Sequence, residues 1–457
     1  HRLKQKIAKG QWKPISDNNE VEPRDGYDVI STIDVNIQDI AHHALLKQLE
    51  DFEAEHGTVI VMETATGEIK AMSNLGRTDE GTYYEKRNYA VYEAHEPGST
   101  FKLMAMVAAL EDGVIDTSQI VDTENGVVRF YGRAVRDSHH GGYGKISAAR
   151  AFEVSSNTAF TKMISEGYKN NPGKFVDRLD DMGVTRKIGL EIKGEGTPRI
   201  PHPDDKGWNG LSLPWMAFGY GVAVTPLQTL TFYNAIANDG EMVKPRFIKE
   251  VKEWDKTIVK MEREVMNPAI CSPETAKKVR EMMKNTVKRG TAANIYTPNF
   301  SMAGKTGTCQ TEYWIEPGRY IASFAGYFPA DNPKYSCIVV IHKPNRSKGY
   351  YGNTVAAPVF KRIAQKIYTD TPIMDELPSL EVESEAVEKD FEKYYTKVQN
   401  EKVLMPNVKG MPAMDAIPLL ENLGLKVQVN GDGIVKSQSI TAGQKIKSNQ
   451  KVNLKLS

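Results

Sequence analysis

Cysteine is scarce in this chain of 457 residues, and the few that are present follow no recognisable spacing. Cys271, Cys309 and Cys337 are an odd number, so they cannot all pair with one another. The sequence contains no Cys-x-x-Cys and no His-Glu-x-x-His, which are common signatures of bound metal. We therefore expect neither a metal ion nor an organic cofactor.

An excess of one charge and long apolar runs are also lacking. Lys plus Arg number 59 and Asp plus Glu number 58, so the net charge of +1 gives no support for a nucleic-acid partner. No apolar stretch approaches the ~18 residues that a membrane-spanning helix needs. The chain opens on His1 rather than methionine, so we expect a fragment. The lack of a long apolar stretch is therefore compatible with a membrane anchor outside this sequence.

The chain does contain three short motifs in a specific order. Ser-x-x-Lys occupies residues 99–102, Ser-x-Asn occupies 155–157, and Lys-Thr-Gly occupies 305–307. In enzymes with this ordered set the first serine is a nucleophile. The order carries the prediction, because each motif alone is common.

Two further matches in the same chain show how common the single motifs are. Ser448 and Lys451 also form Ser-x-x-Lys, but no Lys-Thr-Gly follows them. Residues 16–18 also form Ser-x-Asn, but they precede every candidate nucleophile. Only one ordered set remains.

The spacing of the first motif suits an activated nucleophile. A serine hydroxyl needs a base to remove its proton, and residues three apart on a helix share a face, so the side chains of Ser99 and Lys102 can meet. Lys102 is a base only when neutral, and both burial and a nearby cation such as Lys305 would lower its pKa. The alternative is that Ser99 is only a helix cap and Lys102 a solvated lysine.

The segment that follows Ser99 favours the catalytic interpretation. Residues 101–110 have almost no polar face, which predicts a helix buried at the centre of a domain. A lysine at the head of a buried helix needs a functional reason. Ser99 would lie at the helix N-terminus, where free backbone N–H groups favour developing negative charge.

The other two motifs fall on different kinds of element. Ser155, Ser156 and Asn157 precede a predicted helix at 158–168, so they indicate an inter-helix loop, where Ser and Asn also serve as ordinary caps. Residues 301–309 have the small, alternating side chains of a strand that another backbone can approach closely.

The third motif also matches the end of a phosphate-binding P-loop. That loop requires a glycine five positions before Gly304, where Asn299 stands. No helix pattern follows it, so we exclude a nucleotide site there.

Predicted strands lie at both ends of a large central region. Hairpins are expected within 58–72 and 320–342, and a closing helix at 354–368. Helices are predicted between the hairpins, so we expect one antiparallel sheet closed by segments far apart in the chain. A small α+β unit follows, with predicted elements at 414–423, 425–429, 434–439 and 451–456.

The motifs resemble those of penicillin-binding proteins, and other segments extend the resemblance over nearly the whole chain. The further segments similar to class B penicillin-binding proteins are 27–38, 87–88, 218–228 and 289–292. Division-specific (FtsI-type) transpeptidases are the most similar group. Pro-Asn-Val-x-Gly-Met at 406–411 resembles the opening of a PASTA module, which departs from that family at Ile440, where proline is usual.

The resemblance implies an α/β (α+β) fold of the penicillin-binding transpeptidase type. It has an antiparallel five-stranded sheet flanked by helices, a helical subdomain, and a small C-terminal α+β PASTA domain. The implied parts are the tail of an N-terminal pedestal at 1–27, a transpeptidase domain at 28–370, an acidic linker at 371–402 and the PASTA domain at 403–457.

The resemblance also implies roles for the first two motifs. Ser99 would be the nucleophile and Lys102 its base. Ser155 would relay protons toward the leaving amine, and Asn157 would hold the substrate amide.

The remaining implied site residues come from the third motif. Lys305 and Thr306 would bind the carboxylate of the substrate, and Lys305 would also be a catalytic residue. Gly307 would leave room, and the amide of Thr308 would complete an oxyanion hole with that of Ser99.

The implied function is peptidoglycan D,D-transpeptidation in septal cell-wall synthesis. The nucleophile would attack the D-Ala–D-Ala carbonyl of a stem peptide, release D-alanine, and pass the acyl group to an amine of a neighbouring stem. β-Lactams would mimic the donor and inhibit the enzyme covalently. The implied partners are peptidoglycan stem peptides, an FtsW-type membrane glycan polymerase and divisome proteins, with the catalytic domain periplasmic and anchored in the inner membrane.

Three alternatives remain open. A D,D-carboxypeptidase or a β-lactamase would transfer the acyl group to water, although no Glu-x-x-Leu-Asn follows the second motif, which counts against the class A route. A non-enzymatic sensor or PASTA scaffold would be acylated once and signal. Turnover of a donor peptide with an amine acceptor present separates these possibilities.

Overall fold

The computed structural model describes residues 4–6, 12–14, 26–313, 315, 318–370, 404–447 and 449–457. Ser448, the second Ser-x-Asn at 16–18 and the predicted linker at 371–402 lie outside these residues. The chain divides into two compact units, His1–Ile373 and Met374–Ser457, each of which has its own core.

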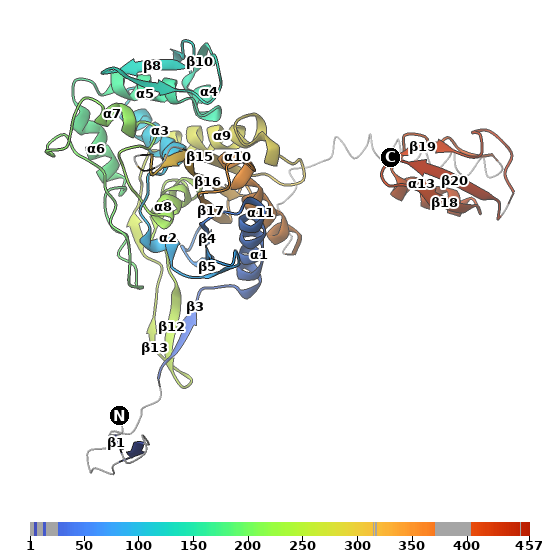
Figure 1. The fold of residues 1–457 in the computed structure, drawn as a ribbon, viewed down its shortest axis with the longest axis horizontal. Helices are drawn as coiled ribbons and strands as arrows, with labels where there is room; N and C mark the ends of the chain where they lie inside the picture. Colours follow the sequence, from blue (N-terminus) through green and yellow to red (C-terminus); the bar gives the residue numbers. More distant parts are fainter. Residues whose placement is uncertain are drawn as a thin grey trace. The chain divides into compact units, whose positions relative to one another are not determined.

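A six-stranded antiparallel sheet forms the centre of the larger unit (Figure 1). Its strands, in spatial order, are β15 (Ala303–Thr311), β16 (Arg319–Phe328), β17 (Tyr335–His342), β4 (His56–Glu63), β5 (Ile69–Arg77) and β6 (Tyr83–Glu85). The predicted hairpins and the pairing of distant segments are confirmed. The predicted count of five strands is one too few, because the short β6 adds to one edge.

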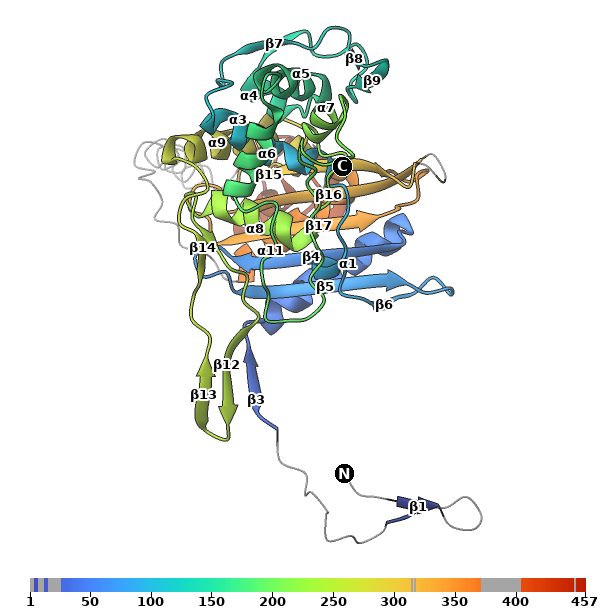
Figure 2. The same cartoon turned by 90° about the vertical axis from the view of Figure 1, so that its left-hand side faces the viewer.

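Both faces of this sheet are covered by helices (Figure 2). The helices are α1 (Val35–Phe52) and α11 (Ala357–Asp370) on one face, and α3 (Lys102–Glu111) and α8 (Pro226–Ala237) on the other. Successive side chains of a strand point to opposite faces, so Val59 and Val61 pack in the apolar cluster with α1 and α11, while Ile60 and Met62 pack in the cluster with α3 and α8. A continuous apolar strand therefore fills two cores at once.

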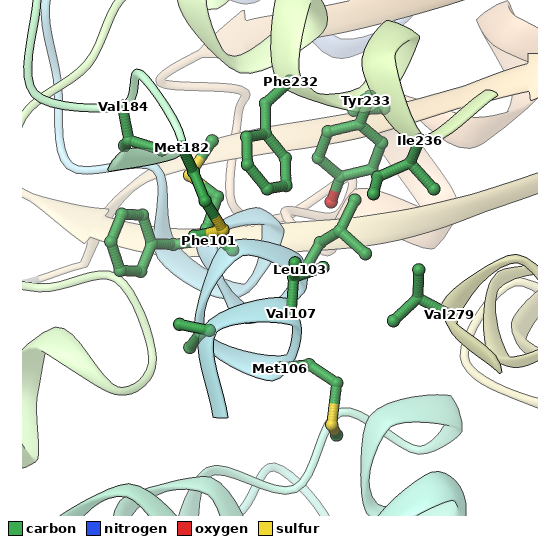
Figure 3. Close-up of a cluster of buried hydrophobic side chains, with 14 of the residues drawn as sticks. Phe101, Leu103, Met106, Val107, Met182, Val184, Phe232, Tyr233, Ile236 and Val279 are labelled. Atoms are coloured by element: carbon green, nitrogen blue, oxygen red, sulfur yellow. The ribbon is translucent and has the colours of Figure 1, made fainter. Parts of the chain in front are cut away.

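The buried helix predicted after Ser99 is α3, and every residue from Lys102 to Ala109 is buried. Figure 3 shows α3 surrounded by side chains from other elements, including Phe232 and Tyr233 of α8. Burying each large apolar side chain contributes about 1.5–3 kcal/mol, so this packing holds the helix firmly in place. Lys102 is the one charged residue in this buried run.

A largely helical region lies beside the sheet. Its helices are α2 (Tyr89–Tyr92), α4 (Ala148–Glu153), α5 (Asn157–Gly167), α6 (Pro172–Asp181), α7 (Ser212–Met216) and α9 (Pro273–Arg289). Short strands pair beside them as β7 (Ile120–Asp122) with β10 (Lys145–Ser147), and β8 (Val127–Phe130) with β9 (Arg133–Arg136). The remaining short helices are η2 (Gly98–Phe101), η3 (Ala293–Ile295) and α10 (Gly352–Val355).

A small three-stranded sheet extends from the body of the larger unit (Figure 2). It consists of β3 (Asp28–Ser31), β12 (Ile248–Glu253) and β13 (Lys256–Lys260). The other short pairs are β11 (Met242–Val243) with β14 (Val265–Asn267), and β1 (Lys4–Lys6) with β2 (Trp12–Pro14).

The smaller unit has the α+β composition that the sequence predicts. Its elements are α13 (Ala413–Asn422), β18 (Lys426–Asn430), β19 (Val435–Gln438) and β20 (Lys451–Leu456). Strand β20 lies between the other two and runs parallel to β18 and antiparallel to β19. Ile440, the departure from the PASTA pattern, is buried in this core, where an apolar side chain fits.

None of the helices in the described residues combines the length and the apolar character that a membrane span requires.

Candidate active site

Ser99 lies in the short helix η2, at the point where the chain enters α3. It is half-buried, and the positive φ of +55° at Gly98 turns the backbone just before it. A Cβ atom at Gly98 would lie 2.9 Å from that of Cys309 in β15. The nucleophile candidate is therefore held against the edge strand that carries the third motif.

Lys102 connects the first motif with the second. Its Nζ donates hydrogen bonds to the carbonyl oxygen of Ser155 (2.7 Å), to Ser155 Oγ (3.2 Å) and to Asn157 Oδ1 (2.7 Å). Burial lowers the pKa of Lys102 to about 7, although the negative charge of Asp137 opposes this change. The expected effect of burial is confirmed, and an amine with this pKa can both accept and return a proton near neutral pH.

The hydrogen bonds of Lys102 bear on how it would reach Ser99. Within the described part of the chain its recorded bonds go to Ser155 and Asn157, and none goes to Ser99. An ammonium has three donors and no lone pair. Loss of one proton frees a lone pair that can accept the proton of Ser99, and such contacts commonly tighten only when substrate binds.

The second motif forms the predicted loop between α4 and α5. Ser155 has a φ of +59°, which turns its carbonyl oxygen toward Lys102. Ser156 is fully buried and caps α5 by accepting from the backbone N–H of Ala159. Asn157 Nδ2 donates to the carbonyl oxygen of Arg136 at 2.9 Å, so one of its two amide hydrogens remains for a ligand.

Asp137 is a site residue that the sequence analysis missed. Its carboxylate accepts hydrogen bonds from Ser156 Oγ (3.0 Å) and from the backbone N–H (3.0 Å) and Oγ1 (2.8 Å) of Thr158. It follows β9, and it thereby joins the β8–β9 hairpin to the second motif. No short motif marks this aspartate in the sequence.

Lys305 lies in β15, at the edge of the large sheet, as predicted for the third motif. It is fully buried, and its Nζ donates to the carbonyl oxygen of Thr306 at 3.0 Å. Burial, and then the positive charge of Lys102, hold the pKa of Lys305 well below its usual range. The charge of Lys102 therefore disfavours protonation of Lys305, whereas the low pKa of Lys102 itself comes from burial and not from Lys305, which we had expected to contribute.

The other residues of the third motif make close contacts with their surroundings. Thr306 Oγ1 lies 2.7 Å from Thr291 Oγ1, and Thr308 Oγ1 accepts from the backbone N–H of Gly352 at 2.9 Å. A Cβ atom at Gly307 would lie 2.2 Å from Ser323 Oγ and would press on Thr100. The glycine is thus required by packing within the protein, whatever it does for a ligand.

One group of side chains outside this site could be considered for a metal ion. Donor atoms of His56, Glu93 and His342 all lie within 4.8 Å of one another. The two imidazole rings stack with centroids 4.2 Å apart and planes inclined by 20°. Their in-plane lone pairs therefore run side by side and do not converge on one ion, whereas His56 Nε2 lies 2.8 Å from the Glu93 carboxylate. We interpret the group as a hydrogen-bonded cluster.

Comparisons with known proteins agree with this geometry. The family model described as penicillin binding protein transpeptidase domain matches residues 57–365, and that of the PASTA domain matches residues 403–457. The chain is 30% identical to stage V sporulation protein D of Bacillus subtilis, over 98% of this chain and 68% of that protein. It is 31% identical to the probable peptidoglycan D,D-transpeptidase PenA of Neisseria flavescens, over 75% of this chain and 82% of that protein.

Solved structures share the fold. Penicillin-binding protein 3 of Mycobacterium tuberculosis in complex with aztreonam matches with a TM-score of 0.66 and 29% identity, over 76% of this chain and 80% of that one. Some relatives are much longer, and the chain spans 56% of the penicillin-binding protein PbpB of Mycolicibacterium smegmatis. The family model covers more than half of the chain, and the chain therefore belongs to the penicillin-binding protein transpeptidase family, with a PASTA domain following the catalytic one.

Proposed function

We propose that this chain is a serine D,D-transpeptidase of peptidoglycan and that β-lactams acylate it at Ser99. The observation that carries the proposal is the state of Lys102, a fully buried lysine with a pKa of about 7 that is hydrogen-bonded to Ser155 and Asn157. At neutral pH a large share of such lysines is unprotonated and can act as a base. Relatives named as peptidoglycan D,D-transpeptidases, and a solved relative that holds aztreonam, support the same reaction.

In the first half of the reaction a stem peptide acylates the enzyme. Neutral Lys102 takes the proton of Ser99 as its Oγ attacks the carbonyl carbon of the penultimate D-alanine. The backbone N–H groups of Ser99 and Thr308 would stabilise the negative oxygen that forms. Lys102 then returns the proton through Ser155, whose Oγ lies 3.2 Å from Nζ, to the amine of the departing D-alanine.

Substrate would be oriented by the second and third motifs. The free amide hydrogen of Asn157 can donate to a backbone carbonyl of the donor peptide. Lys305 and Thr306 would bind its terminal carboxylate, and the negative charge of that carboxylate would raise the pKa of Lys305 and favour its charged form. Lys305 would then carry its positive charge only after the donor has bound, while Lys102 stays neutral until it accepts the proton of Ser99.

In the second half an amine of a neighbouring stem attacks the acyl-enzyme. Lys102, neutral again after the first half, would accept the proton of the amine through Ser155 as the new amide bond forms. It would then give that proton to Ser99 Oγ as the ester bond breaks and the serine is released. A carboxypeptidase or β-lactamase would instead admit water at this step, and a sensor would stop at the acyl-enzyme.

Mass spectrometry and a coupled turnover assay test the proposal. Incubation with benzylpenicillin should add the mass of one penicillin to the intact protein, and Ser99→Ala should abolish the addition while Ser448→Ala does not. A D-Ala–D-Ala donor peptide with an amine acceptor should give cross-linked product in excess over hydrolysed donor. Hydrolysis alone would identify a carboxypeptidase, and a stable acyl-enzyme without turnover would identify a sensor.

The cellular role rests on the relatives. Similarity to the peptidoglycan D,D-transpeptidase FtsI of Buchnera aphidicola supports septal synthesis with an FtsW-type polymerase and divisome proteins. Similarity to stage V sporulation protein D over 98% of the chain supports wall synthesis in the spore as a second candidate. Either role would place the catalytic domain outside the cytoplasm, with an inner-membrane anchor. Depletion in the source organism separates them, since failed septa indicate the first and failed spores the second.

The domain boundaries are part of the same proposal. We assign a pedestal tail to 1–27, the transpeptidase domain to 28–370, the linker to 371–402 and the PASTA domain to 403–457. The division between the two compact units after Ile373 supports the second boundary. Limited proteolysis should cut first within 371–402 and release two stable fragments.

A further inference from the structure

The segment that follows α9 contacts both the second and the third motif, although no role has been assigned to it. Arg289, the last residue of α9, forms a two-pronged ion pair with Glu153, with Nε–Oε2 and Nη2–Oε1 distances of 3.1 and 2.8 Å. Arg150 also donates to this carboxylate at 2.8 Å. The side chain of Glu153 is only 2% exposed, and it lies two residues before Ser155. The pair therefore joins α9 to the base of the second motif.

The backbone strengthens this junction. The N–H of Thr291 donates to the carbonyl oxygen of Glu153 at 3.0 Å. A Cβ atom at Gly290 would lie 2.3 Å from the same oxygen, so only glycine allows the two backbones to approach this closely. Glu153 thus holds Thr291 in place through its side chain, by way of Arg289, and through its main chain.

Thr291 in turn contacts the third motif. Its Oγ1 lies 2.7 Å from Oγ1 of Thr306, a short hydroxyl–hydroxyl hydrogen bond, and Thr306 is only 6% exposed. Either oxygen can be the donor in this pair. If Thr306 donates its proton to a ligand carboxylate, its oxygen must accept the proton of Thr291. The contact would then fix the direction in which the Thr306 hydroxyl points.

We infer that Thr291 is a positioning residue that orients the Thr306 hydroxyl toward the terminal carboxylate of the donor, and that Glu153 and Arg289 hold Thr291 for this purpose. The inference rests on the proposed function, in which Thr306 binds that carboxylate. The helix end that precedes the second motif then also affects how firmly the third motif binds the donor.

Acylation kinetics with two ligands test this inference. One ligand is benzylpenicillin, and the other is its methyl ester, which lacks the carboxylate. Thr291→Val removes the hydroxyl at nearly constant volume, and Thr291→Ser keeps it. We expect Thr291→Val to weaken binding of benzylpenicillin before acylation roughly fivefold, the scale of one hydrogen bond, and to leave the ester and the maximal acylation rate nearly unchanged. Thr291→Ser should behave like the unmodified protein.

Glu153→Gln tests the link between Glu153 and Thr291, and Thr306→Val tests separately whether Thr306 binds the carboxylate. Glu153→Gln should weaken the binding of benzylpenicillin but not that of the ester. Combined with Thr291→Val it should cause little further loss of binding, because both changes act through one contact. The inference is wrong if Thr291→Val and Thr291→Ser bind benzylpenicillin equally well, or if Thr291→Val weakens the binding of both ligands by the same factor. Thr306→Val provides the reference, since a loss that is not selective for the carboxylated ligand would overturn the assignment of Thr306 itself. A melting temperature for each variant identifies a misfolded protein, and Thr291→Ala then replaces the valine variant.

Discussion

Acylation should depend on pH with a midpoint that Asp137 helps to set. Lys102 has a pKa of about 7 because burial lowers it while Asp137 opposes the change. Only the neutral amine can accept the proton of Ser99, so below this pKa each pH unit should reduce the second-order rate constant of acylation about tenfold. That constant reports the free enzyme, in which the pKa applies.

Removing the charge of Asp137 should move this midpoint downward. Asp137→Asn eliminates a negative charge that favours protonated Lys102, so the folded-state pKa of the lysine should fall further. A charge–charge interaction of about 1.4 kcal/mol corresponds to a shift of about one pH unit. The asparagine can still accept from the backbone N–H of Thr158, and the hydroxyl of Ser156 can turn to accept from it, so the loop should keep its shape.

A fluorescent penicillin in a stopped-flow instrument, between about pH 5.5 and 9, gives the required constants. The control is Glu166→Gln, which removes an exposed carboxylate from α5 that is paired with Lys169. We expect the control to keep the original midpoint and Asp137→Asn to be faster than the unmodified protein below pH 7. A midpoint that stays in place or rises in Asp137→Asn would refute the assignment of Lys102 as the titrating base.

Other expected outcomes concern the nucleophile, the two lysines and the last domain. Ser99→Ala should lose all covalent labelling by a β-lactam, and its stability should change by no more than about 1 kcal/mol because the side chain caps no helix, which thermal unfolding can verify. Lys102→Ala should slow acylation by every β-lactam about 10²–10⁴-fold, whereas Lys305→Ala should act mainly on carboxylated ligands, by about 10- to 100-fold in their binding. Equal losses on carboxylated and neutral acyl donors in both variants would contradict these roles. Deleting residues 371–457 should leave the acylation rate almost unchanged, and a greatly slowed rate would show that the PASTA domain contributes to the site.

The candidate site can be found in the sequence because its main residues lie in short, self-contained motifs. Ser99 and Lys102 are three residues apart, and the apolar residues that follow them could only form a buried helix. The hairpins of the large sheet were equally visible, since continuous apolar strands flank clear turns. The short strand β6 was missed because its three residues, Tyr83–Glu85, are mostly exposed and carry no apolar alternation.

The residues that support the site could not be predicted in the same way. Asp137 and Glu153 are two among 58 acidic residues, and what distinguishes them is a partner brought near by folding. Thr291 belongs to a segment that resembles the family, but its contact with Thr306 joins the segment after α9 to β15. Sequence reasoning finds groups that are chemically distinct, whereas positioning residues are defined by geometry between distant segments.

The same burial that makes Lys102 a base should destabilise the fold. Its pKa of about 7 in the folded protein lies below the ordinary value of 10.5, so between these values the unfolded chain holds a proton that the folded protein lacks. The free energy of unfolding should therefore rise with pH across this window, and the penalty should be fully present below about pH 7. At about 1.4 kcal/mol per unit, the penalty is of the order of 5 kcal/mol.

Lys102→Met should remove this penalty and yield a more stable, inactive protein. The lost hydrogen bonds to Ser155 and Asn157 offset part of the gain at about 1 kcal/mol each, so we expect a net increase of about 2 kcal/mol in the free energy of unfolding at pH 6. All five tryptophans lie before residue 374, so tryptophan fluorescence during urea unfolding follows the catalytic unit alone. Lys162→Met is the control, because that lysine is partly exposed and its pair with Glu124 is superficial, so its removal should change stability by less than about 1 kcal/mol. The advantage of Lys102→Met should shrink as the pH approaches 10. An equal or lower stability at pH 6 would mean that burial does not lower the pKa of Lys102 in the folded protein. The argument that Lys102 is the base would then fail.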